Sequence, residues 1–480
     1  MLAWTRLLVL KIAAILKVWL DYLKPVDVDK ISMPDHHCAL LRGVAIRMKA
    51  KAVGLDFGTT NSAIAQVAED GSVSLAAFPA GRERARSETM RSILFFAADP
   101  HGDEPRLSVG DEAIDHYIAS GANGRLIQSL KSFLADRLFD ETNIMGDFYS
   151  LEDLITPILK RLRKVAEDQF GELPLNLVVG RPVHFSSAQN DADDQRATTR
   201  LAGAIRRAGW KEITFEFEPV AAAYHYASTI AREELILVAD FGGGTSDFSI
   251  VRLLPPSPAP SHERYEILAN DGVALAGDAF DGEIVRRLVA PELGRGSQYR
   301  SPYGQVLPMP TWFYAQMERW HFLSFLKAPS TMNKLRDLEH QSLAPEKVSA
   351  LIHIVENDLG YLLFKSVEQT KLALSDAEST RFRFADHDVL IQKPATREAF
   401  ESWIARELRA IAACVERVLA SAEVLPASID SVFLTGGSSF VPIVRRIFAK
   451  TFGAEKIRTG SEFTSIARGL ALRALEIAQP

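Results

Sequence analysis

The sequence predicts an α/β fold that contains a repeated unit. Three observations predict it. Strand-like apolar runs alternate with runs of helical period along the chain. An apolar strand followed by Asp-Phe-Gly occurs twice, at Asp56 and at Asp240, 184 residues apart, which is too far for a solenoid repeat and suits a duplicated domain. The 480 residues exceed one small core and suit about three domains or two large lobes.

The composition narrows the classes of function. With 47% hydrophobic and 24% charged residues, the chain has the make-up of an ordinary globular protein. Lys and Arg number 55 against 61 Asp and Glu, so the net charge of −6 gives no basic footprint, and we expect no nucleic-acid partner. The two cysteines, Cys38 and Cys414, are too few for a disulfide framework or a four-cysteine zinc site, which fits a reducing, cytoplasmic location.

Residues 1–52 are interpreted as an amino-terminal extension. The apolar run of residues 1–24 is interrupted by Arg6, Lys11 and Lys17, and charges at the centre of a bilayer are costly, so we expect no membrane span. Two interpretations stay open. Residues 1–24 form an amphipathic helix that contacts a membrane surface, or residues 1–47 precede the true start of the protein at Met48.

The first half of the chain is expected to begin with a hairpin and to continue as strands and helices in alternation. The hairpin bends at GTTNS, between an apolar run that ends in Asp56 and a second run that ends near Ser74. Further elements are a helix over 151–170, a buried strand over 175–183 and a helix over 193–209.

The second half is expected to restart the pattern with another hairpin over 235–253. Residues 253–264 are rich in Pro and Ser and predict a surface loop, and residues 291–350 are the least regular part. The aromatic residues of that part are expected to belong to the core. A strand over 431–435 and a closing helix follow. The aromatic residues are Trp312, Phe313, Tyr314, Trp320, Phe322 and Phe325.

The two hairpin turns have the composition of phosphate-binding sites. Successive N–H groups of a tight turn attract anions, and Gly, Thr and Ser let phosphate oxygens approach the backbone. A carboxylate ~5 Å from a phosphate oxygen would repel it by ~3 kcal/mol at an effective dielectric near 20. A divalent cation between the phosphates and the carboxylates of Asp56 and Asp240 is therefore needed. Mg²⁺, which keeps waters and bridges carboxylates to phosphates, meets that need. The sequence therefore predicts a magnesium nucleotide held from two sides.

A third turn is a candidate for the nucleoside. The strand over 431–435 ends at Gly436, Gly437 and Ser438, and a helix is expected to begin near Val441 and Pro442. Neither GxxxxGK[ST] nor GxGxxG occurs in the sequence, so Walker and Rossmann nucleotide sites are not supported.

Taken together, these motifs resemble the actin/hexokinase/heat-shock ATPase superfamily and, within it, the seventy-kilodalton heat-shock (DnaK-like) chaperones. The matching stretches are VGLDFGTTNSAIA, LVADFGGGTSDFSIV, FEPVAAAYHYA, ALAGDAFDGEIV, VEQTKLALSD and VFLTGGSSFVPIVRRIF, in the family's order. The resemblance implies the two-lobed actin-like ATPase fold, with duplicated ribonuclease H-like domains and a cleft between the lobes. Lobe I would span 53–234, completed by a carboxy-terminal helix over about 461–480, and lobe II would span 235–460 with an insertion at 291–350.

The resemblance also implies the role of each site residue. Asp56 and Asp240 would lie around the magnesium ion, and Lys131, Glu218, Asp240 and Asp247 would be catalytic, with Lys131 stabilising charge on the γ-phosphate. The remaining residues would bind the nucleotide, and K⁺ is a further candidate ion. The nucleotide-binding residues are Gly58, Thr59, Thr60, Gly242, Gly243, Gly244, Thr245, Gly277, Glu368, Lys371, Gly436, Gly437, Ser438 and Phe440.

Three positions depart from the family pattern. The family places adenine between two arginines, where this chain has Leu372 and Phe440, and Phe463 replaces an acid near the adenosine. Stacking of the base on Phe440 would replace one of the lost contacts. The chain resembles short, YegD-like members that consist of the ATPase domain, so we expect no peptide-binding domain.

We therefore expect a chaperone-like protein that binds and slowly hydrolyses Mg·ATP and whose lobe closure signals to a protein partner or co-chaperone. The alternative is a nucleotide-binding scaffold without productive hydrolysis, for which Leu372 and Phe440 leave room. A small-molecule kinase is a third class, but the sequence shows no recognisable site for an acceptor hydroxyl.

Overall fold

A computed structural model describes residues 50–80, 85–97, 105–121, 124–227, 230–254, 265–387, 389–458 and 464–478. All described residues belong to one compact unit, residues 48–480. The amino-terminal helix predicted over 1–24, the alternative start after residue 47, residues 255–264 of the loop predicted over 253–264, and Phe463 all lie outside the described residues. Within the described ranges, no helix has the length and apolar character needed to cross a bilayer.

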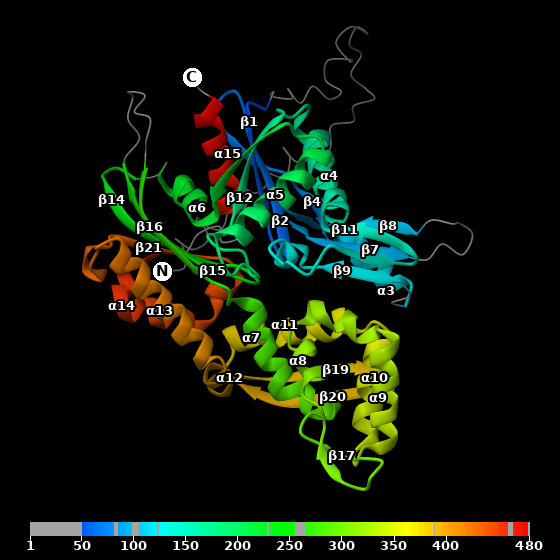
Figure 1. Cartoon of the computed structure of the whole chain (residues 1–480). Coiled ribbons are helices and arrows are strands. Elements are labelled where there is room, and N and C mark those ends of the chain that lie inside the picture. Colours follow the sequence, from blue (N-terminus) through cyan, green and yellow to red (C-terminus); the bar gives the residue numbers. More distant parts are fainter. Residues whose placement is uncertain are drawn as a thin grey trace, which may run out of the picture. The chain divides into compact units, whose positions relative to one another are not determined.

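The amino-terminal half is built on a mixed sheet with the strand order β13-β12-β1-β2-β3. Strand β1 pairs in parallel with β12 on one side and antiparallel with β2 on the other, and β6 pairs with the end of β2. The hairpin bend therefore lies at the end of a central, buried strand (Figure 1). The strands are β1 (Ala52–Phe57), β2 (Asn61–Val67), β3 (Val73–Leu75), β6 (Met90–Arg91), β12 (Asn176–Arg181) and β13 (Glu212–Phe217).

The second half repeats this topology. Its main sheet has the order β16-β15-β14-β21-β22, in which β14 is antiparallel to β15 and parallel to β21. Five strands of the first sheet, all but β6, thus have a counterpart with the same neighbours and directions, and the prediction of an α/β fold with a repeated unit is confirmed. The strands are β14 (Glu234–Phe241), β15 (Ser246–Leu253), β16 (Tyr265–Val273), β21 (Ser431–Thr435) and β22 (Ile457–Arg458).

Two long helices complete the core of the first half. Ser150 caps α4 (Leu151–Phe170) in a reciprocal bond with Asp153, and Asn190 caps α5 (Asp191–Arg207), as expected for side chains that satisfy free N–H groups. The predicted helix over 151–170 agrees at both ends, and that over 193–209 begins and ends two residues earlier. Smaller elements are β4 (Phe78–Ala80), β5 (Ala85–Ser87), β7 (Ile93–Ala97), β8 (Arg106–Val109), α3 (Asp111–Ala119), β9 (Arg125–Gln128), a 3₁₀ helix (Leu130–Phe133), β10 (Glu141–Ile144) and β11 (Asp147–Ser150).

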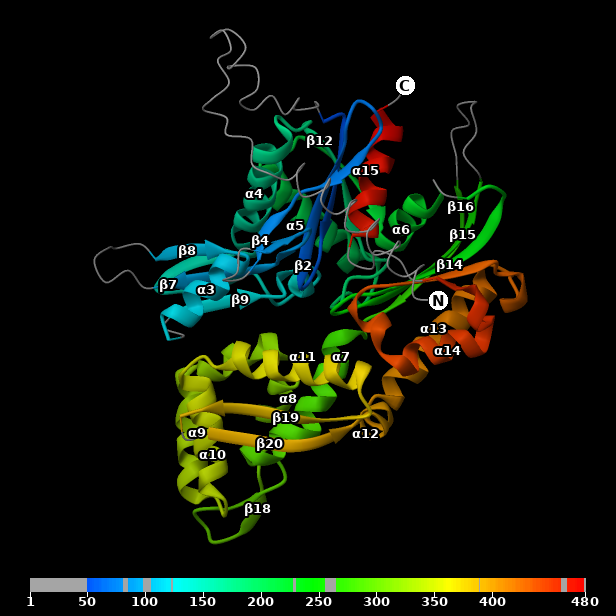
Figure 2. The ribbon, with the colours of Figure 1, turned by 180° about the vertical axis from the view of Figure 1, so that it is seen from behind.

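The last helix of the chain packs on the first sheet. Helix α15 (Ser465–Ala478) lies beside α6 (Glu218–Ala227) and strands β1 and β2 in both views (Figures 1 and 2). Glycines allow this close approach. A Cβ at Gly54 would lie 2.2 Å from the backbone N of Ala471, and one at Gly469 would lie 1.6 Å from the carbonyl O of Ala221. The sheet and the two helices therefore share one core.

The second half adds a helical region to its sheet, with one continuous apolar core. Of the aromatic residues predicted to be core, Phe313 and Tyr314 are buried, while Trp312 is 41% exposed. The elements are α7 (Gly277–Ile284), a π-helical turn (Val285–Val289), a 3₁₀ turn (Ala290–Leu293), β17 (Gln298–Arg300), β18 (Val306–Pro308), α8 (Trp312–Met317), a 3₁₀ segment (Trp320–Lys327), α9 (Pro329–Gln341), α10 (Pro345–Glu356), α11 (Gly360–Asp376), β19 (Ser379–Asp386), β20 (Val389–Thr396), α12 (Arg397–Trp403), α13 (Ala405–Ser421), the 3₁₀ turns Pro426–Ser428, Gly437–Phe440 and Ala454–Lys456, and α14 (Pro442–Phe452).

Candidate functional site

The two hairpin turns predicted to bind phosphates lie against each other. A Cβ placed on Gly243 would lie 3.1 Å from Thr60 Oγ1 and 3.5 Å from Thr59 Cβ. The turn after β14 therefore faces the turn after β1, although 184 residues separate them in sequence. Gly242 and Gly244 flank the contact, and the N–H of Gly58 donates to Ser62 Oγ within its own turn (3.2 Å). The fold thus brings the two predicted phosphate turns together.

Four carboxylates gather where these turns meet the sheets. Asp56 and Asp240 are the last residues but one of β1 and β14, Asp247 lies directly opposite Asp240 in the hairpin, and Glu218 begins α6. Burial and the neighbouring charge of Glu218 raise the pKa of Asp56 to about 8 and that of Asp247 to about 8. The same two causes raise the pKa of Asp240 to about 6. The acids accordingly repel one another in the absence of a cation.

Lys131 supplies positive charge to this cluster. Its Nζ donates to Glu218 Oε1 at 2.5 Å, and both side chains are buried. Burial alone would lower the pKa of the Lys131 ammonium, but attraction to Glu218 and Asp56 outweighs it, so the pKa is raised and the lysine is charged. The structure thus brings Lys131 to the acids, from a 3₁₀ helix rather than from an α-helix.

Hydrogen bonds orient two of the carboxylates. Thr435 at the end of β21 donates from Oγ1 to Asp240 Oδ1 (2.5 Å), and the N–H of Val183 donates to Asp247 Oδ1 (2.8 Å). Gly272 lies across the sheet from Asp247, and a Cβ there would approach Asp247 Oδ1 to 2.7 Å. The glycine therefore leaves room for the carboxylate.

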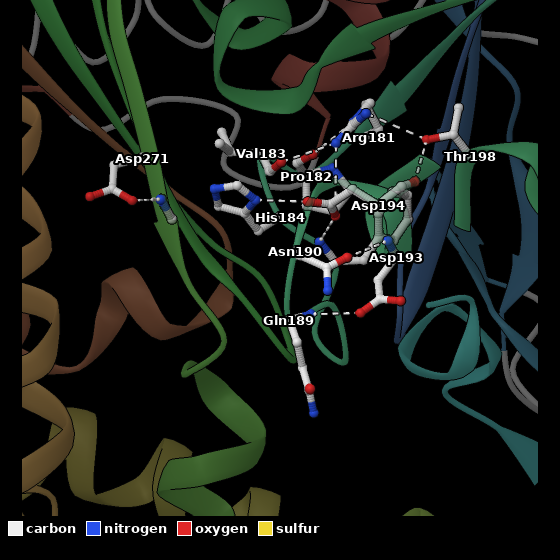
Figure 3. A network of polar contacts seen from close by, with 12 residues as sticks. Arg181, Pro182, Val183, His184, Gln189, Asn190, Asp193, Asp194, Thr198 and Asp271 are labelled. Atoms are coloured by element: carbon white, nitrogen blue, oxygen red, sulfur yellow. Dashed lines mark hydrogen bonds and ion pairs between the residues drawn. The ribbon is translucent and has the colours of Figure 1, made fainter. Parts of the chain in front are cut away.

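The loop that presents Val183 is itself fixed by a polar network (Figure 3). Arg181 donates to the carbonyl oxygens of Pro182 and Val183, both at 3.0 Å. The buried Asp194 accepts from the N–H of Phe185 (2.8 Å) and pairs with His184 Nδ1 (2.8 Å). This network holds the backbone that contacts Asp247.

The third predicted turn meets the second one through Gly277. A Cβ on Gly277 would lie 2.9 Å from Ser438 Oγ and 3.5 Å from Lys371 Nζ. The backbone N–H of Gly277 donates to the carbonyl O of Gly242 (3.3 Å). Gly436 adopts φ 78° beside the backbone of Phe241, a conformation that favours glycine. Gly437 and Ser438 begin the 3₁₀ turn that precedes α14. The predicted nucleoside-binding residues therefore surround the start of α7.

The side chains expected at the base are more exposed than those at the phosphates. Phe440 is 37% exposed, with the guanidinium of Arg445 5.5 Å from its ring centroid, and Leu372 is 51% exposed. Glu368 on α11 pairs with Arg91 of β6 at 3.6 Å. A pair between β6 and α11 means that both halves of the repeat contribute to this end of the site.

Sequence reasoning missed two acids in this region. Asp281 of α7 accepts from Lys371 Nζ (2.8 Å), and the N–H of Asp278 donates to the carbonyl O of Gly243 (2.8 Å). Burial and the nearby Asp281 raise the pKa of Asp278 to about 6. Both residues lie in ALAGDAFDGEIV, so the motif signalled them, but their contacts depend on how α7 packs.

The geometry fits a magnesium nucleotide. In the described part of the chain, no three His, Cys, Asp or Glu side chains form a metal site by themselves. Asp56 and Asp240 would hold Mg²⁺ together with its waters and with phosphate oxygens, as this ion prefers. Asp247 Oδ2 is buried and has no hydrogen-bond partner among the described residues, as expected for an atom that awaits a ligand or water. Because the glycines that face the threonines have no side chain, they leave space for the phosphates.

Comparison with known proteins decides the family. A model of the family described as "Hsp70 protein" matches residues 128–295 and 352–479, which is more than half of the chain. The chain belongs to the Hsp70 family. The match contains Lys131, Glu218, Asp240 and the Gly436 turn, while the first phosphate turn lies ahead of it.

Individual relatives extend this Hsp70 similarity over most of the sequence. The chain is 26% identical over 432 residues to "Chaperone protein DnaK" of Thermosipho melanesiensis, which covers 90% of this chain and 60% of that protein. It is 26% identical over 432 residues to the DnaK of Thermotoga maritima, with the same coverage. It is 25% identical over 447 residues to that of Thermus thermophilus (88% and 60%). The chain thus spans about three fifths of the length of these relatives.

Proposed function

We propose that this Hsp70-family protein binds and slowly hydrolyses Mg·ATP and that nucleotide-dependent closure of two lobes acts on a protein partner. The observation that carries the proposal is the charge cluster of Asp56, Glu218, Asp240 and Lys131 at the contact of the two Gly/Thr turns. Three acids with raised pKa values, Asp56, Asp240 and Asp247, mark a functional site better than a structural ion pair would.

The proposed lobes follow the repeat. Residues 53–234 together with the helix that ends the chain form lobe I, and residues 235–460 form lobe II, with an insertion at 291–350. The cleft lies between the turns at Thr59 and Gly243. Two sheets of the same topology, each presenting a Gly/Thr bend and an aspartate, support this division.

The chain's own residues supply the catalytic steps. Backbone N–H groups of the turns at Gly58–Thr60 and Gly242–Thr245 hold the phosphates. Glu218 and Asp247 orient the attacking water, and the Lys131 ammonium stabilises charge that develops on the terminal phosphate. Mg²⁺, when bound between Asp56 and Asp240, offsets repulsion between carboxylates and phosphates. Lys131 uses one of its three N–H donors on Glu218, so the other two are left for a phosphate oxygen.

At the nucleoside end, Lys371 and Glu368 would contact the ribose, and the base would lie against Phe440. Ser438 and Gly277, which pack together, would form the floor beneath the sugar. K⁺ as a second ion, a co-chaperone as partner and a cytoplasmic location stay predictions that go with the family assignment.

A second function is favoured by the exposure of Leu372 and Phe440. Where the family holds adenine between two arginines, these side chains offer a weaker grip, so a scaffold that binds nucleotide without productive turnover is the alternative. Both functions share the phosphate turns and differ in hydrolysis.

Steady-state ATP hydrolysis, with Mg²⁺ and with chelator, tests the choice. We expect magnesium-dependent turnover that Lys131→Ala lowers by about 100-fold, because one preorganised group at developing charge is worth about 2.7–4 kcal/mol. Lys160→Ala, an exposed position on α4, is the matched control and should keep full activity. Nucleotide binding without turnover in the parent protein would overturn the catalytic function and leave the scaffold.

A further inference from the structure

A cavity of about 510 Å³ adjoins the phosphate turns of the proposed nucleotide site. Its walls come from the segment after Lys131, the loop after β12, and helices α7 and α13. Gly244 forms part of its wall, and a Cβ there would lie 2.5 Å from Ser186 Oγ, which also lines the cavity. Small-molecule sites in proteins commonly measure about 300–1,000 Å³, so the cavity can hold an organic ligand.

Two buried carboxylates line this cavity with unsatisfied oxygen atoms. Glu283 on α7 is 5% exposed and Glu407 on α13 is 9% exposed. The Oε2 atom of each has no hydrogen-bond partner in the described part of the chain, although Arg287 Nε lies within ion-pair range of Glu283 Oε2, at 3.7 Å. A buried acceptor without a partner is costly and calls for an explanation, and here both acceptors belong to walls of one cavity.

Two arginines near these carboxylates, Arg286 and Arg295, already form ion pairs. Arg286 donates to Glu283 and to Glu318, and Glu318 also pairs with Arg295 at 3.1 Å. Within the described residues, no ion pair joins a cation to Glu407 directly, although the charge of Glu407 acts on Arg286. Five carboxylates and three arginines line the cavity, and two of those arginines, Arg319 and Arg406, are exposed. The lining thus holds two more acidic than basic side chains, and Arg287 and Arg295 pair with two of these acids, Glu283 and Glu318, from outside the lining.

We propose that this cavity binds a small organic molecule that carries a protonated primary amine, with Glu407 and Glu283 accepting its N–H bonds. An ammonium supplies the two things that Glu407 Oε2 lacks among its contacts in the described residues, positive charge and a hydrogen-bond donor. A bare metal ion would leave most of the volume empty. A neutral polyol would supply donors but would leave the negative charge uncompensated. The proposal does not depend on ATP hydrolysis.

Calorimetric titration of putrescine into the full chain, without nucleotide, tests the proposal. We expect saturable binding of one molecule at about 0.15 M salt, where charges further apart than about 8 Å are screened. Glu407→Gln should weaken binding by about tenfold or more. Glu416→Gln, an exposed position on the same helix, should leave it unchanged, which separates the cavity from general attraction to a chain of net charge −6.

A second variant acts by volume rather than charge. Ala410 lines the cavity from α13, so Ala410→Phe should abolish putrescine binding while all carboxylates remain. Thermal unfolding of each variant verifies that it folds. Absence of saturable heat in the parent, equal weakening by Glu407→Gln and Glu416→Gln, or binding of sorbitol in place of putrescine would each overturn the proposal.

Discussion

The two ends of the candidate nucleotide site are built differently. At the phosphate end, the contacts come from backbone turns and from acids at strand ends, and the side chains of Lys131 and Glu218 are buried. At the nucleoside end, Phe440 and Leu372 are 37% and 51% exposed and lie on separate helical segments. Turns fixed by a sheet tolerate little change, whereas exposed side chains can vary. The phosphate end should therefore govern whether a nucleotide binds, and the nucleoside end should govern how tightly and which one.

The largest effect is expected from Gly243→Val. Even a Cβ would lie 3.1 Å from Thr60 Oγ1 and 3.3 Å from Asp278 Oδ1, so a branched side chain would force the turns apart. Because the backbone N–H groups would lose their position, we expect nucleotide affinity to fall by about 100-fold or more. Titration of a fluorescent ATP analogue measures this.

Gly296→Val is the control for Gly243→Val. A Cβ at Gly296 would meet no atom within 4 Å, but its φ of 81° adds strain, so this variant reports general destabilisation without touching the site. If Gly243→Val bound nucleotide as tightly as the parent does, the contact between the two turns would not be needed for nucleotide binding.

The pH dependence of stability is the second test of the phosphate end. The pKa of Asp56 and that of Asp247 are about 8 in the folded protein, above the ordinary value for an unfolded chain. A raised folded pKa contributes stability that is complete below pH 4 and is lost as pH rises toward 8. The titration of these two groups should thus lower the melting temperature of the metal-free protein as the pH rises from about 5 to about 8.

Asp56→Asn separates this effect from the other titrations of the protein. It removes one of the acids, so the fall in melting temperature across that range should be shallower than in the parent. Mg²⁺ with ADP should also make the decrease in melting temperature with pH shallower, because the cation favours the ionised carboxylates. An identical slope in Asp56→Asn would show that this carboxylate does not carry the dependence.

The comparison of the two ends also explains how much the sequence could predict. The Asp-Phe-Gly repeat predicted the duplicated sheets, because a strand followed by a Gly/Thr bend is a local pattern that period and turn chemistry reveal. The meeting of Thr60 with Gly243 follows from no local pattern; it was implied by the prediction of one magnesium nucleotide held from two sides and by the family resemblance. The Asp281 contact to Lys371 and the cavity at Glu407 arise from packing of distant helices, which no local pattern encodes.

The third prediction concerns the contact that holds α11, the helix carrying Glu368 and Lys371. Tyr117 on α3 donates from its hydroxyl to the carbonyl O of Asp358, and its ring meets that of Tyr361 at 5.8 Å, edge to face. Tyr117→Ala removes both contacts between the halves and should speed nucleotide release several-fold by stopped-flow fluorescence. Tyr117→Phe keeps the ring and should have a smaller effect. Equal release rates in all three proteins would contradict a role for this contact.

The smallest effect is expected at the base itself, and it decides between the two ends most directly. Phe440→Arg replaces an exposed ring by the residue that the family resemblance expects there, and a guanidinium adds about 0.5–1 kcal/mol of cation–π attraction at an exposed site. Affinity for ATP should therefore rise two- to fivefold, with little change in turnover at saturation, because the phosphate turns are untouched. Arg445 is 5.5 Å from the present ring, so the double change Phe440→Arg with Arg445→Gln relieves the repulsion between two guanidiniums and should give the larger gain. Affinities for ATP and GTP, measured side by side, separate base contacts from phosphate contacts. If Phe440→Arg changed turnover at saturation as much as it changed affinity, the two ends would be coupled, and the division drawn between them would have to be abandoned.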